Sequence, residues 1–543
     1  MTQRDSNPDT YDREAEFKHE KQHLTDVVSG IDKDIKGREE RASRPIMGPD
    51  VRSADAVTSH AKEMLTRLKS ARNNPFFGRL DYSDEGREDV RTVYIGRHLV
   101  DIKDVPDGLV IKWDVPVADL FYNPSGIYKT PLGKRSASVY LNRSLSIEEA
   151  QLLDFEDRLR LPTPRMLTER LSGPSSEQMT DAIETLQPEQ YQALSKTDSP
   201  VLIVQGAAGT GKSIVALQRI AFVLSPRSKV GILGRNPSPD RVIMFGPSPA
   251  FLKYVSGLLP GLDVQNVRQQ TITQWMLGQF TPRARVTLKG GEERVLNDLM
   301  SRQRFGKIQV QAHLFKGSLK MKRLLDNYVR ELKRNSERNT RRQSSNIISR
   351  LSLNISVADF RNRVDNAFST HPELNAARAF LIDGLAELMT LTLPTPPRRR
   401  NAPRSEVVAV HRKVVERELE YSCPFHDFKG EYVRLMSGPD VIMNYSKGAL
   451  DWDAANDICQ TVPRNSTGRS LGLTDLAAAL YLDYALNGFI NERQRENFEH
   501  VVVDEAQDVS PIEMELLRIH SVNDNFTILG DLETVSVSNQ DKD

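Results

Sequence analysis

Apolar residues in this chain follow two different spacings, which separate short buried strands from helices. Four runs, 201–204, 242–245, 501–503 and 526–529, consist largely of apolar and often β-branched residues, as expected for core strands. Residues 214–224 instead place apolar side chains at helical spacing, so that one face of a helix can pack on a sheet. A core strand followed by such a helix predicts an α/β fold with a parallel sheet.

A long segment interrupts this α/β pattern. About 250 residues separate the second run from the third, far more than a crossover helix requires. We therefore expect a large, mainly helical insertion at 271–470, between a first part of the α/β domain at 176–270 and a second part at 471–543. Residues 473–487, in the second part, have the spacing of an amphipathic helix.

The N-terminal residues predict a pair of helices. Residues 1–10 are polar and expected to be disordered. Residues 11–44 are highly charged with a thin apolar stripe, residues 54–71 have a denser stripe, and a break containing Pro45 separates them. The stripe of the first helix consists of Phe17, Leu24, Val27, Val28 and Ile31. We expect residues 1–74 to form a helical hairpin, which is either an arm that projects to a partner or an ordinary pair packed on the body.

The pattern becomes β-rich over residues 75–175. Alternating segments at 76–82, 92–97 and 109–114, punctuated by glycine and proline, predict the short strands of a small module. Residues 144–175 are expected to be helical at first and then loop-like, where prolines gather.

Composition places the chain among ordinary soluble proteins. Its 543 residues are 27% charged and 38% hydrophobic, and the net charge is +1, so a basic surface must be local. Cys423 and Cys459 have no ligand cluster near them and fit a reduced compartment. The N-terminus lacks the apolar core of a signal peptide, and no apolar run is long enough to span a bilayer. We therefore expect a cytoplasmic protein with no membrane partner.

The first part of the insertion is locally basic. Residues 281–350 contain eighteen Lys or Arg and six Asp or Glu, and a Pro/Arg-rich break follows at 394–404. The basic residues include Lys320, Lys322, Arg323, Lys333, Arg334, Arg338, Arg341 and Arg342. Two interpretations stay open, a surface that contacts nucleic acid or a solvated helical face.

The first core strand leads into a glycine-rich motif. Residues 206–213 match G-x-x-x-x-G-K-[ST] at every fixed position, and the flanking strand and helix make a chance glycine loop the weaker alternative. Glycines let successive N–H groups face one concavity, where phosphate oxygens bind beside the helix N-terminus. Lys212 can reach the β- and γ-phosphates, and Ser213 can ligate Mg²⁺. The expected nucleotide-binding residues are Gly206, Ala207, Ala208, Gly209, Thr210, Gly211, Lys212 and Ser213.

A second motif supplies carboxylates. The strand at 501–503 ends in Asp504, placed to hold Mg²⁺, and Glu505, placed to orient or deprotonate the attacking water. A solvated acidic turn is the alternative, but the glycine-rich motif upstream favours a nucleoside triphosphate site. Gln190, in a short helix at 186–194, has the amide donor and acceptor that an adenine edge requires.

Four elements occur in a defined order along the chain. They are Gln190, the glycine-rich motif, Asp-Glu-Ala-Gln-Asp at 504–508, and a strand that ends in Gly530 and Asp531. Together they resemble superfamily-one helicases of the UvrD/Rep type, which have a RecA-like core. Further segments resemble HelD-type proteins, namely residues 76–82, 94–97, 113–116, 245–252 and 480–484.

The resemblance implies a function. HelD-like proteins bind core RNA polymerase and use ATP to release it from nucleic acid, so DNA or transcription-complex nucleic acid is a second expected partner. Their N-terminal hairpin enters the secondary channel of the polymerase, and their insertion enters the main channel. By resemblance, Gln190 contacts adenine, Lys212 the phosphates, Ser213 and Asp504 hold Mg²⁺, and Glu505 activates water. Gln507 and Asp531 would couple the nucleotide to a second RecA-like domain.

The chain departs from the family pattern in three places. Asp114 replaces an arginine, and Thr534 replaces a glutamine. The chain also ends before a second RecA-like domain, so we expect a truncated protein that hydrolyses ATP very slowly alone. Two other functions are considered, a UvrD-type DNA helicase or translocase fragment, and a polymerase-binding protein that does not hydrolyse ATP.

Overall fold

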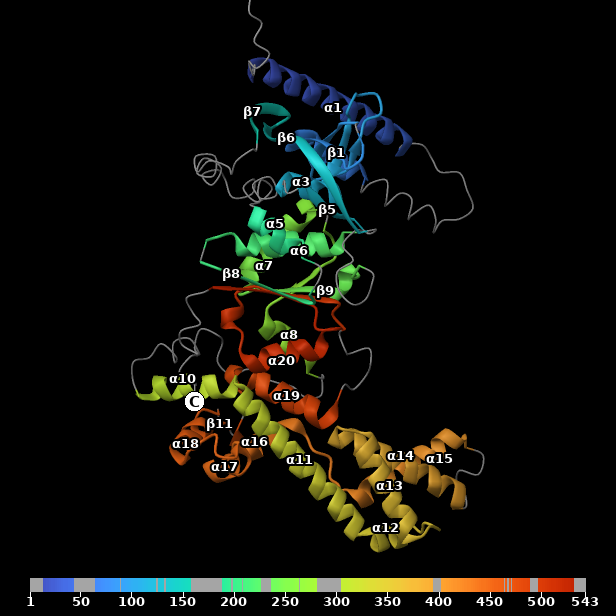
Figure 1. Ribbon diagram of the computed structural model, residues 1–543. Coiled ribbons are helices and arrows are strands. Elements are labelled where there is room, and N and C mark those ends of the chain that lie inside the picture. Colours follow the sequence, from blue (N-terminus) through green and yellow to red (C-terminus); the bar gives the residue numbers. More distant parts are fainter. Residues whose placement is uncertain are drawn as a thin grey trace, which may run out of the picture. The chain divides into compact units, whose positions relative to one another are not determined.

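The computed structural model describes the chain from residue 13 to residue 531 with gaps (Figure 1). The gaps are residues 43–63, 88, 124–125, 131–132, 158–187, 197–198, 208, 226–235, 263, 281–303, 394–401, 463, 466–467, 470 and 489–496. The expectation for residues 1–10, and the departure at Thr534, lie outside the described residues. The chain divides into two compact units, which we treat separately: unit 1 is residues 1–269, 498–506 and 522–543, and unit 2 is residues 270–497 and 507–521.

A five-stranded sheet forms the centre of unit 1. Its strands, in sheet order, are β10 (Arg268–Gln270), β9 (Val242–Phe245), β13 (His500–Val503), β14 (Phe526–Asp531) and β8 (Val201–Gly206). The pairs β9–β13, β13–β14 and β14–β8 are parallel, and every residue of β9 and β13 is buried. This arrangement confirms the predicted parallel sheet and all four predicted core strands.

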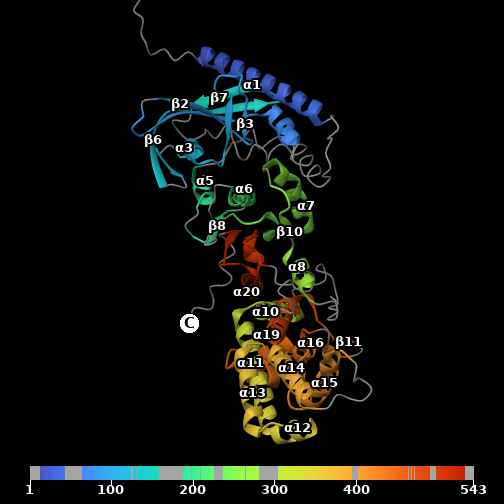
Figure 2. The same cartoon turned by 90° about the vertical axis from the view of Figure 1, so that its right-hand side faces the viewer.

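Helices flank this sheet in unit 1 (Figure 2). They are α5 (Pro188–Leu194), α6 (Lys212–Leu224) and α7 (Pro249–Leu258), with short 3-10 turns η2 (Pro239–Arg241) and η3 (Leu259–Leu262). Helix α7 begins where the Ser248 hydroxyl accepts a hydrogen bond from the Phe251 N–H, which satisfies a free helix N-terminal donor. Helix α6 buries ten of its thirteen residues, so it fixes the end of the glycine-rich loop against the sheet.

The N-terminal part of unit 1 is a seven-stranded, mainly antiparallel sheet. Its strands are β1 (Gly78–Asp84), β2 (Arg91–Gly96), β3 (Val100–Asp101), β4 (Leu109–Lys112), β5 (Ile127–Thr130), β6 (Gly133–Glu148) and β7 (Gln151–Asp157), and η1 (Pro116–Ala118) and α3 (Asp119–Tyr122) lie between β4 and β5. The expected helix over 144–175 is wrong for residues 144–157, which form the end of β6 and all of β7. Leu145, Ile147, Leu152 and Phe155 are buried here, and cross-strand packing overrides the weak local helical spacing.

The predicted N-terminal hairpin is antiparallel over its described part. Helix α1 (Arg13–Ala42) lies beside a second helix at residues 64–73. Arg72 pairs with Asp32 at 2.6 Å and Lys69 with Glu39 at 2.7 Å, so residue numbers rise along one helix as they fall along the other. The described part of the hairpin packs on the body of unit 1, as the second of the two alternatives has it. Leu24, Val27 and Ile31 share a core with Tyr94 of β2 and Phe155 of β7, and with Phe76 just before β1.

A buried charge network explains how so polar a helix can pack on a sheet. The Glu20 carboxylate of α1 is fully buried and accepts hydrogen bonds from Arg79 at 2.9 Å, Arg143 at 2.8 Å and the Tyr94 hydroxyl at 2.9 Å. A buried carboxylate is tolerated when opposite charges and hydrogen bonds satisfy its oxygens. The sequence pattern identified the apolar stripe of α1 but not this polar contact.

The N-terminal sheet and the parallel sheet share one hydrophobic core inside unit 1. Trp113, Phe121 and Tyr122 of the N-terminal part lie in the same buried cluster as Ile220 of α6 and Val502 of β13. The unusual Asp114 next to Trp113 is buried and pairs with Lys112 at 3.5 Å, which compensates its charge.

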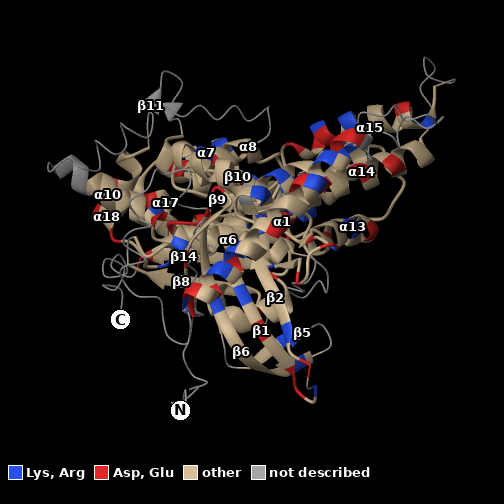
Figure 3. Ribbon diagram, turned by 90° about the horizontal axis from the view of Figure 1, so that it is seen from above, with Lys and Arg blue, Asp and Glu red and all other residues tan. Residues whose placement is uncertain are grey.

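Unit 2 is mainly helical. Its helices are α8 (Ile272–Gln279), α10 (Arg304–Lys316), α11 (Leu319–Arg342), α12 (Ser344–Arg350), α13 (Val357–Thr370), α14 (Leu374–Thr392), α15 (Arg404–Leu419), α16 (Phe428–Leu435), α17 (Pro439–Ser446), α18 (Trp452–Gln460), α19 (Leu476–Asn487) and α20 (Pro511–His520), with the turn η5 (Leu473–Asp475) and the short strands β11 (Arg464–Asn465) and β12 (Gly468–Arg469). The long helix α11 packs against α13, α17 and α19. Basic and acidic positions are interspersed along α14 and α15 (Figure 3), so the basic excess of the insertion is not spread evenly.

Helix α19 corrects one detail of the predicted amphipathic helix at 473–487. The residues from Leu476 to Asp483 are all buried, as is Leu486, so the helix is enclosed on nearly all sides. Its position among α8, α11, α14 and α16 explains the burial. No helix in the described ranges is long and apolar enough to cross a membrane.

Candidate nucleotide-binding site

The glycine-rich loop joins β8 to α6. Gly209 has φ +80° and Gly211 has φ +82°, both in the left-handed region that favours glycine. Gly211 is the cap residue immediately before Lys212, the first residue of α6. The loop therefore ends at a helix N-terminus, which favours anions. Ala208 lies outside the described residues.

Lys212 lies at the base of this loop. Its Nζ donates hydrogen bonds to the carbonyl oxygens of Gly206 at 3.1 Å and Ala207 at 2.9 Å, and it forms an ion pair with Asp531 at the end of β14. The side chain is only 8% exposed. The ammonium group is thus held where the loop, the sheet edge and the N-terminus of α6 meet.

Asp504 follows β13 directly and is only 4% exposed. Its Oδ1 accepts a hydrogen bond from the Glu505 N–H at 3.0 Å, while its buried Oδ2 accepts none from the described residues. Burial raises the pKa of the Asp504 carboxyl, and interactions with the Ser213 side chain and the Glu505 N–H oppose this rise. A carboxylate oxygen left free beside a hydroxyl fits a Mg²⁺ ion that takes most of its other ligands from phosphate and water.

The described residues form no other candidate metal site. The described part of the chain contains no group of three or more His, Cys, Asp or Glu side chains that could hold a metal ion. A nucleotide-dependent Mg²⁺ site does not need such a group, because phosphate oxygens supply the remaining ligands. The residues present therefore fit Mg²⁺ only together with a phosphate-bearing ligand.

Glu505 adopts an unusual backbone conformation. Its φ of +51° is in the left-handed region, which non-glycine residues seldom occupy and which turns the chain sharply after β13. Such strain commonly occurs at functional sites. Gln507 follows in the 3-10 turn η6 (Ala506–Asp508) and is half-buried.

Helix α5 brings Gln190 to the loop. The Gln190 Nε2 donates to the Thr210 carbonyl oxygen at 3.4 Å, so this side chain lies beside the residues expected to bind phosphate. The structure thus brings together Gln190, the described loop residues, Ser213, Asp504 and Asp531, although they span more than 300 residues of sequence.

Asp119, Tyr122 and Arg219 hold α5 in place, and the sequence patterns did not identify them. The Tyr191 hydroxyl donates a hydrogen bond to Asp119, and the Tyr191 ring stacks on Tyr122 with centroids 4.2 Å apart. From the other side, the buried guanidinium of Arg219 on α6 donates to the Leu194 carbonyl oxygen at the end of α5. These groups position Gln190, but no local spacing pattern links Asp119 or Tyr122 to it.

Replacing Lys212 by alanine is expected to weaken ATP binding by about 10- to 100-fold. The variant loses one charge-assisted hydrogen-bonding group at the phosphates, worth about 1.5–3 kcal/mol. The affinity for a fluorescent ATP analogue with Mg²⁺ measures the effect. Lys253→Ala, which removes an exposed lysine from α7, is the matched control and should bind as the wild type does. Equal affinity of the two variants would contradict the assignment of Lys212.

His500, at the start of β13, gives unit 1 a specific acid sensitivity. It is fully buried, shares a hydrogen bond with the Thr527 hydroxyl at 3.0 Å, and burial lowers its pKa to about 3. Below about pH 6.5 the unfolded chain binds a proton that the folded chain does not, so stability falls as the pH decreases. Relative to His500→Gln, the wild type should lose about 2 kcal/mol of unfolding free energy between about pH 7.5 and pH 5. Urea unfolding at both pH values tests this, and parallel pH profiles would contradict it.

Comparison with known protein families agrees with the site and the N-terminal fold. Residues 17–170 match the family model of the N-terminal domain of DNA helicase IV HelD. Residues 293–533 match the family model of the UvrD/REP helicase N-terminal domain. The second match covers Asp504 and Asp531, and the glycine-rich loop lies upstream of it. No protein in a curated collection matches the chain significantly.

These matches and the assembled site define a superfamily-one helicase protein of the UvrD/Rep type. The match over residues 17–170 identifies the chain, within that class, as HelD-like. Domains of the UvrD type use ATP and Mg²⁺, in agreement with the chemistry of the loop and of Asp504.

Proposed function

We propose that this protein is an ATP-dependent factor that binds core RNA polymerase and helps to release it from nucleic acid. One observation carries the proposal. The HelD-type N-terminal region lies in the same compact unit, and in the same hydrophobic core, as the nucleotide site. Because they share one core, a conformational change of the loop on nucleotide binding can be transmitted through packed side chains to the region that would contact the polymerase.

Within this proposal each site residue has a role. Gln190 contacts the adenine edge, and Lys212 binds the β- and γ-phosphates beside the N–H groups of Gly206 to Gly211. Ser213 and Asp504 would hold Mg²⁺, which would neutralise charge on the phosphates. Glu505 orients the attacking water and accepts its proton. Gln507 and Asp531 would couple the state of the nucleotide to a second RecA-like domain.

Co-migration with core RNA polymerase on a sizing column tests the proposal, at salt high enough to screen loose charge contacts. Deleting the whole hairpin would be uninformative, because Leu24, Val27 and Ile31 of α1 belong to the core of unit 1. We would instead replace residues 43–63 by a glycine–serine linker of equal length, which preserves the contacts of α1 with residues 64–73. The wild type should form a complex, and the linker variant should lose most of it.

The thermal unfolding of the linker variant provides the control. An unchanged midpoint shows that lost binding reflects the replaced segment rather than unfolding. If the wild type forms no complex with the polymerase, the proposal is wrong. Binding that persists unchanged in the linker variant would refute a role for the hairpin in contacting the polymerase.

A UvrD-type nucleic-acid translocase is the second candidate, because the UvrD/REP model matches residues 293–533. This function requires ATP turnover that DNA stimulates without any polymerase present. Measuring turnover with single-stranded DNA alone, and with polymerase alone, separates the two functions.

A further inference from the structure

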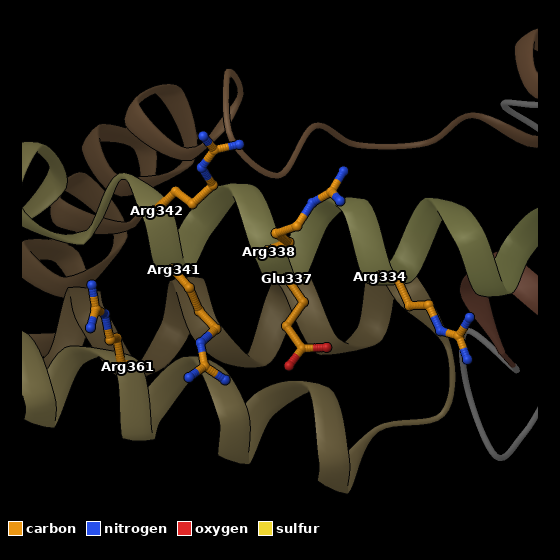
Figure 4. A pocket seen from close by; sticks show the side chains of 6 residues that line it. All are labelled: Arg334, Glu337, Arg338, Arg341, Arg342 and Arg361. Atoms are coloured by element: carbon orange, nitrogen blue, oxygen red, sulfur yellow. The ribbon is translucent and has the colours of Figure 1, made fainter.

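A groove in unit 2 concentrates arginine side chains on one surface. It has a volume of about 450 Å³ and is lined by Arg334, Glu337, Arg338, Arg341, Arg342 and Arg361. The first five residues belong to α11 and the last to α13. Figure 4 shows Arg338 and Arg342 projecting from one side of α11, and Arg341 directed toward the neighbouring helix. The lining has a formal charge of +4, whereas the whole chain has a net charge of +1.

Helix spacing produces this arrangement. Residues 334, 338 and 342 follow one another at intervals of four, so their backbone positions lie along one stripe of α11. Figure 4 shows the Arg334 side chain directed to the same side as Glu337 and Arg341. The opposite side of this stretch of the helix is buried through Ser336 and Thr340. Like charges at this spacing destabilise a helix by about 0.2–0.5 kcal/mol per pair, so the stripe is not explained by helix stability.

Part of the cluster does have a structural role. Arg341 forms an ion pair with Asp365 of α13 at 2.8 Å, and Arg341 and Arg342 lie in the last turn of α11, where cations are favourable. Arg334 and Arg338 lie one to two turns earlier, beyond that effect. In the described part of the chain no carboxylate lies within ion-pairing distance of Arg334, Arg338, Arg342 or Arg361. All four are exposed.

We propose that this groove binds the phosphodiester backbone of a nucleic-acid duplex. Arg334 and Arg342 are separated by eight residues, or about 12 Å along α11. One strand of a duplex carries a phosphate about every 3.4 Å along its axis, so this length corresponds to about three or four phosphates. The planar guanidinium groups match phosphate oxygens in a bidentate geometry.

The residues that line the groove favour a nucleic-acid duplex over a single strand and over a protein partner. A single strand would be bound partly through bases stacked on aromatic rings, and all six lining residues are charged. A protein partner would require apolar side chains at the centre of the interface, which the lining lacks. A polar, strongly basic surface is typical of contacts with a nucleic-acid backbone. The groove shares no residue with the nucleotide site, so its binding should not require ATP.

The test measures binding of the full chain to a fluorescent DNA duplex of mixed sequence, by anisotropy over a range of salt concentrations. Arg334→Gln/Arg338→Gln should weaken binding and reduce the slope of log K against log salt by about 2. Between about 50 and 200 mM salt, the wild type should then lose about tenfold more affinity than this variant.

Two further variants serve as controls. Arg323→Gln/Arg363→Gln removes the same charge from exposed positions on α11 and α13 that do not line the groove, and it should keep nearly the wild-type slope. Arg334→Lys/Arg338→Lys keeps the charge and should keep the slope while losing some affinity. All of these positions are exposed, and an unchanged thermal midpoint verifies that each variant folds.

Several outcomes would overturn the proposal. One is a groove variant whose affinity and slope equal those of the Arg323/Arg363 control. Another is a variant that loses binding to polyglutamate but not to the duplex, which would assign the groove to acidic polypeptides. Tighter binding of a single strand than of the duplex would also refute it. Failure to bind polymerase would leave the duplex measurement unaffected, so the two proposals fail separately.

Discussion

Replacing Glu505 by glutamine is expected to lower ATP turnover by about 10²- to 10⁴-fold, the range typical of a lost general base. Glutamine has nearly the same shape but cannot accept the proton of the attacking water. The side chain follows Asp504 at the end of β13, and its left-handed backbone conformation sets its direction. Binding of ATP and Mg²⁺ should change little, because the phosphate contacts come from the glycine-rich loop and Lys212. Single-turnover hydrolysis of labelled ATP, with the protein in excess, measures the loss.

The control for this prediction is Glu515→Gln, the same chemical change on α20. Glu515 pairs with Arg518 at 2.8 Å, so its substitution should affect turnover by no more than about twofold, as is usual for a partly exposed ion pair. If Glu505→Gln and Glu515→Gln hydrolyse ATP at the same rate, Glu505 does not activate the water. If the wild type shows no turnover that Lys212→Ala abolishes, the protein belongs to the class that binds without hydrolysing.

Replacing Lys316 by methionine should destabilise unit 2 by about 3–5 kcal/mol, the usual cost of leaving a buried charge without its partner. Lys316 ends α10 and forms an ion pair with Asp475 at 2.5 Å, and both side chains are fully buried. The ammonium group also donates to the Thr461 hydroxyl at 2.9 Å. Among the described residues, Asp475 would keep only the hydrogen bonds from the Tyr432 hydroxyl and the Gly472 N–H, each at 2.9 Å.

Hydrogen exchange measured by mass spectrometry localises this effect. Peptides that cover α10 and α19 should lose protection in Lys316→Met, whereas peptides from the parallel sheet of unit 1 should not. Lys320→Met, at an exposed position of the neighbouring helix, is the matched control. The double variant Lys316→Met/Asp475→Leu should recover much of the protection, because an apolar pair of similar size replaces the buried charges. A single variant as well protected as the control would show that the ion pair contributes little.

Local sequence patterns predicted the parts of the site that depend on neighbouring residues. The loop from Gly206 to Ser213 combines backbone conformation, helix N-terminus and lysine within eight residues, so its spacing alone identifies it. The strand β13 was recognisable because buried parallel strands are apolar on both faces, and β8 and β14 because apolar and β-branched residues favour strands. Their order in the sheet brings Asp504 and Asp531 to the loop, as the resemblance to helicases implied.

Other features depend on residues far apart in the sequence, and local patterns could not show them. The support of α5 by Asp119, Tyr122 and Arg219 requires contacts across up to 72 residues. The packing of α1 depends on Glu20. A charged side chain is expected to face solvent, but ion pairs with Arg79 and Arg143 allow this carboxylate to be buried. Residues 144–157 form strands because β1 supplies a partner for β6, a tertiary effect that local propensity does not contain.

The core shared by the two sheets of unit 1 also determines how this part of the protein should melt. Trp113, Phe121 and Tyr122 pack with Tyr191, Ile220 and Val502, so the N-terminal sheet shares this core with the parallel sheet in addition to the core that it forms with α1. The region that matches the HelD N-terminal model, residues 17–170, therefore packs part of its apolar side chains against residues that follow it. An isolated polypeptide that stopped there would expose these aromatic side chains to water and would aggregate more readily. Heat and denaturant should instead unfold the N-terminal sheet and the nucleotide site in one cooperative transition.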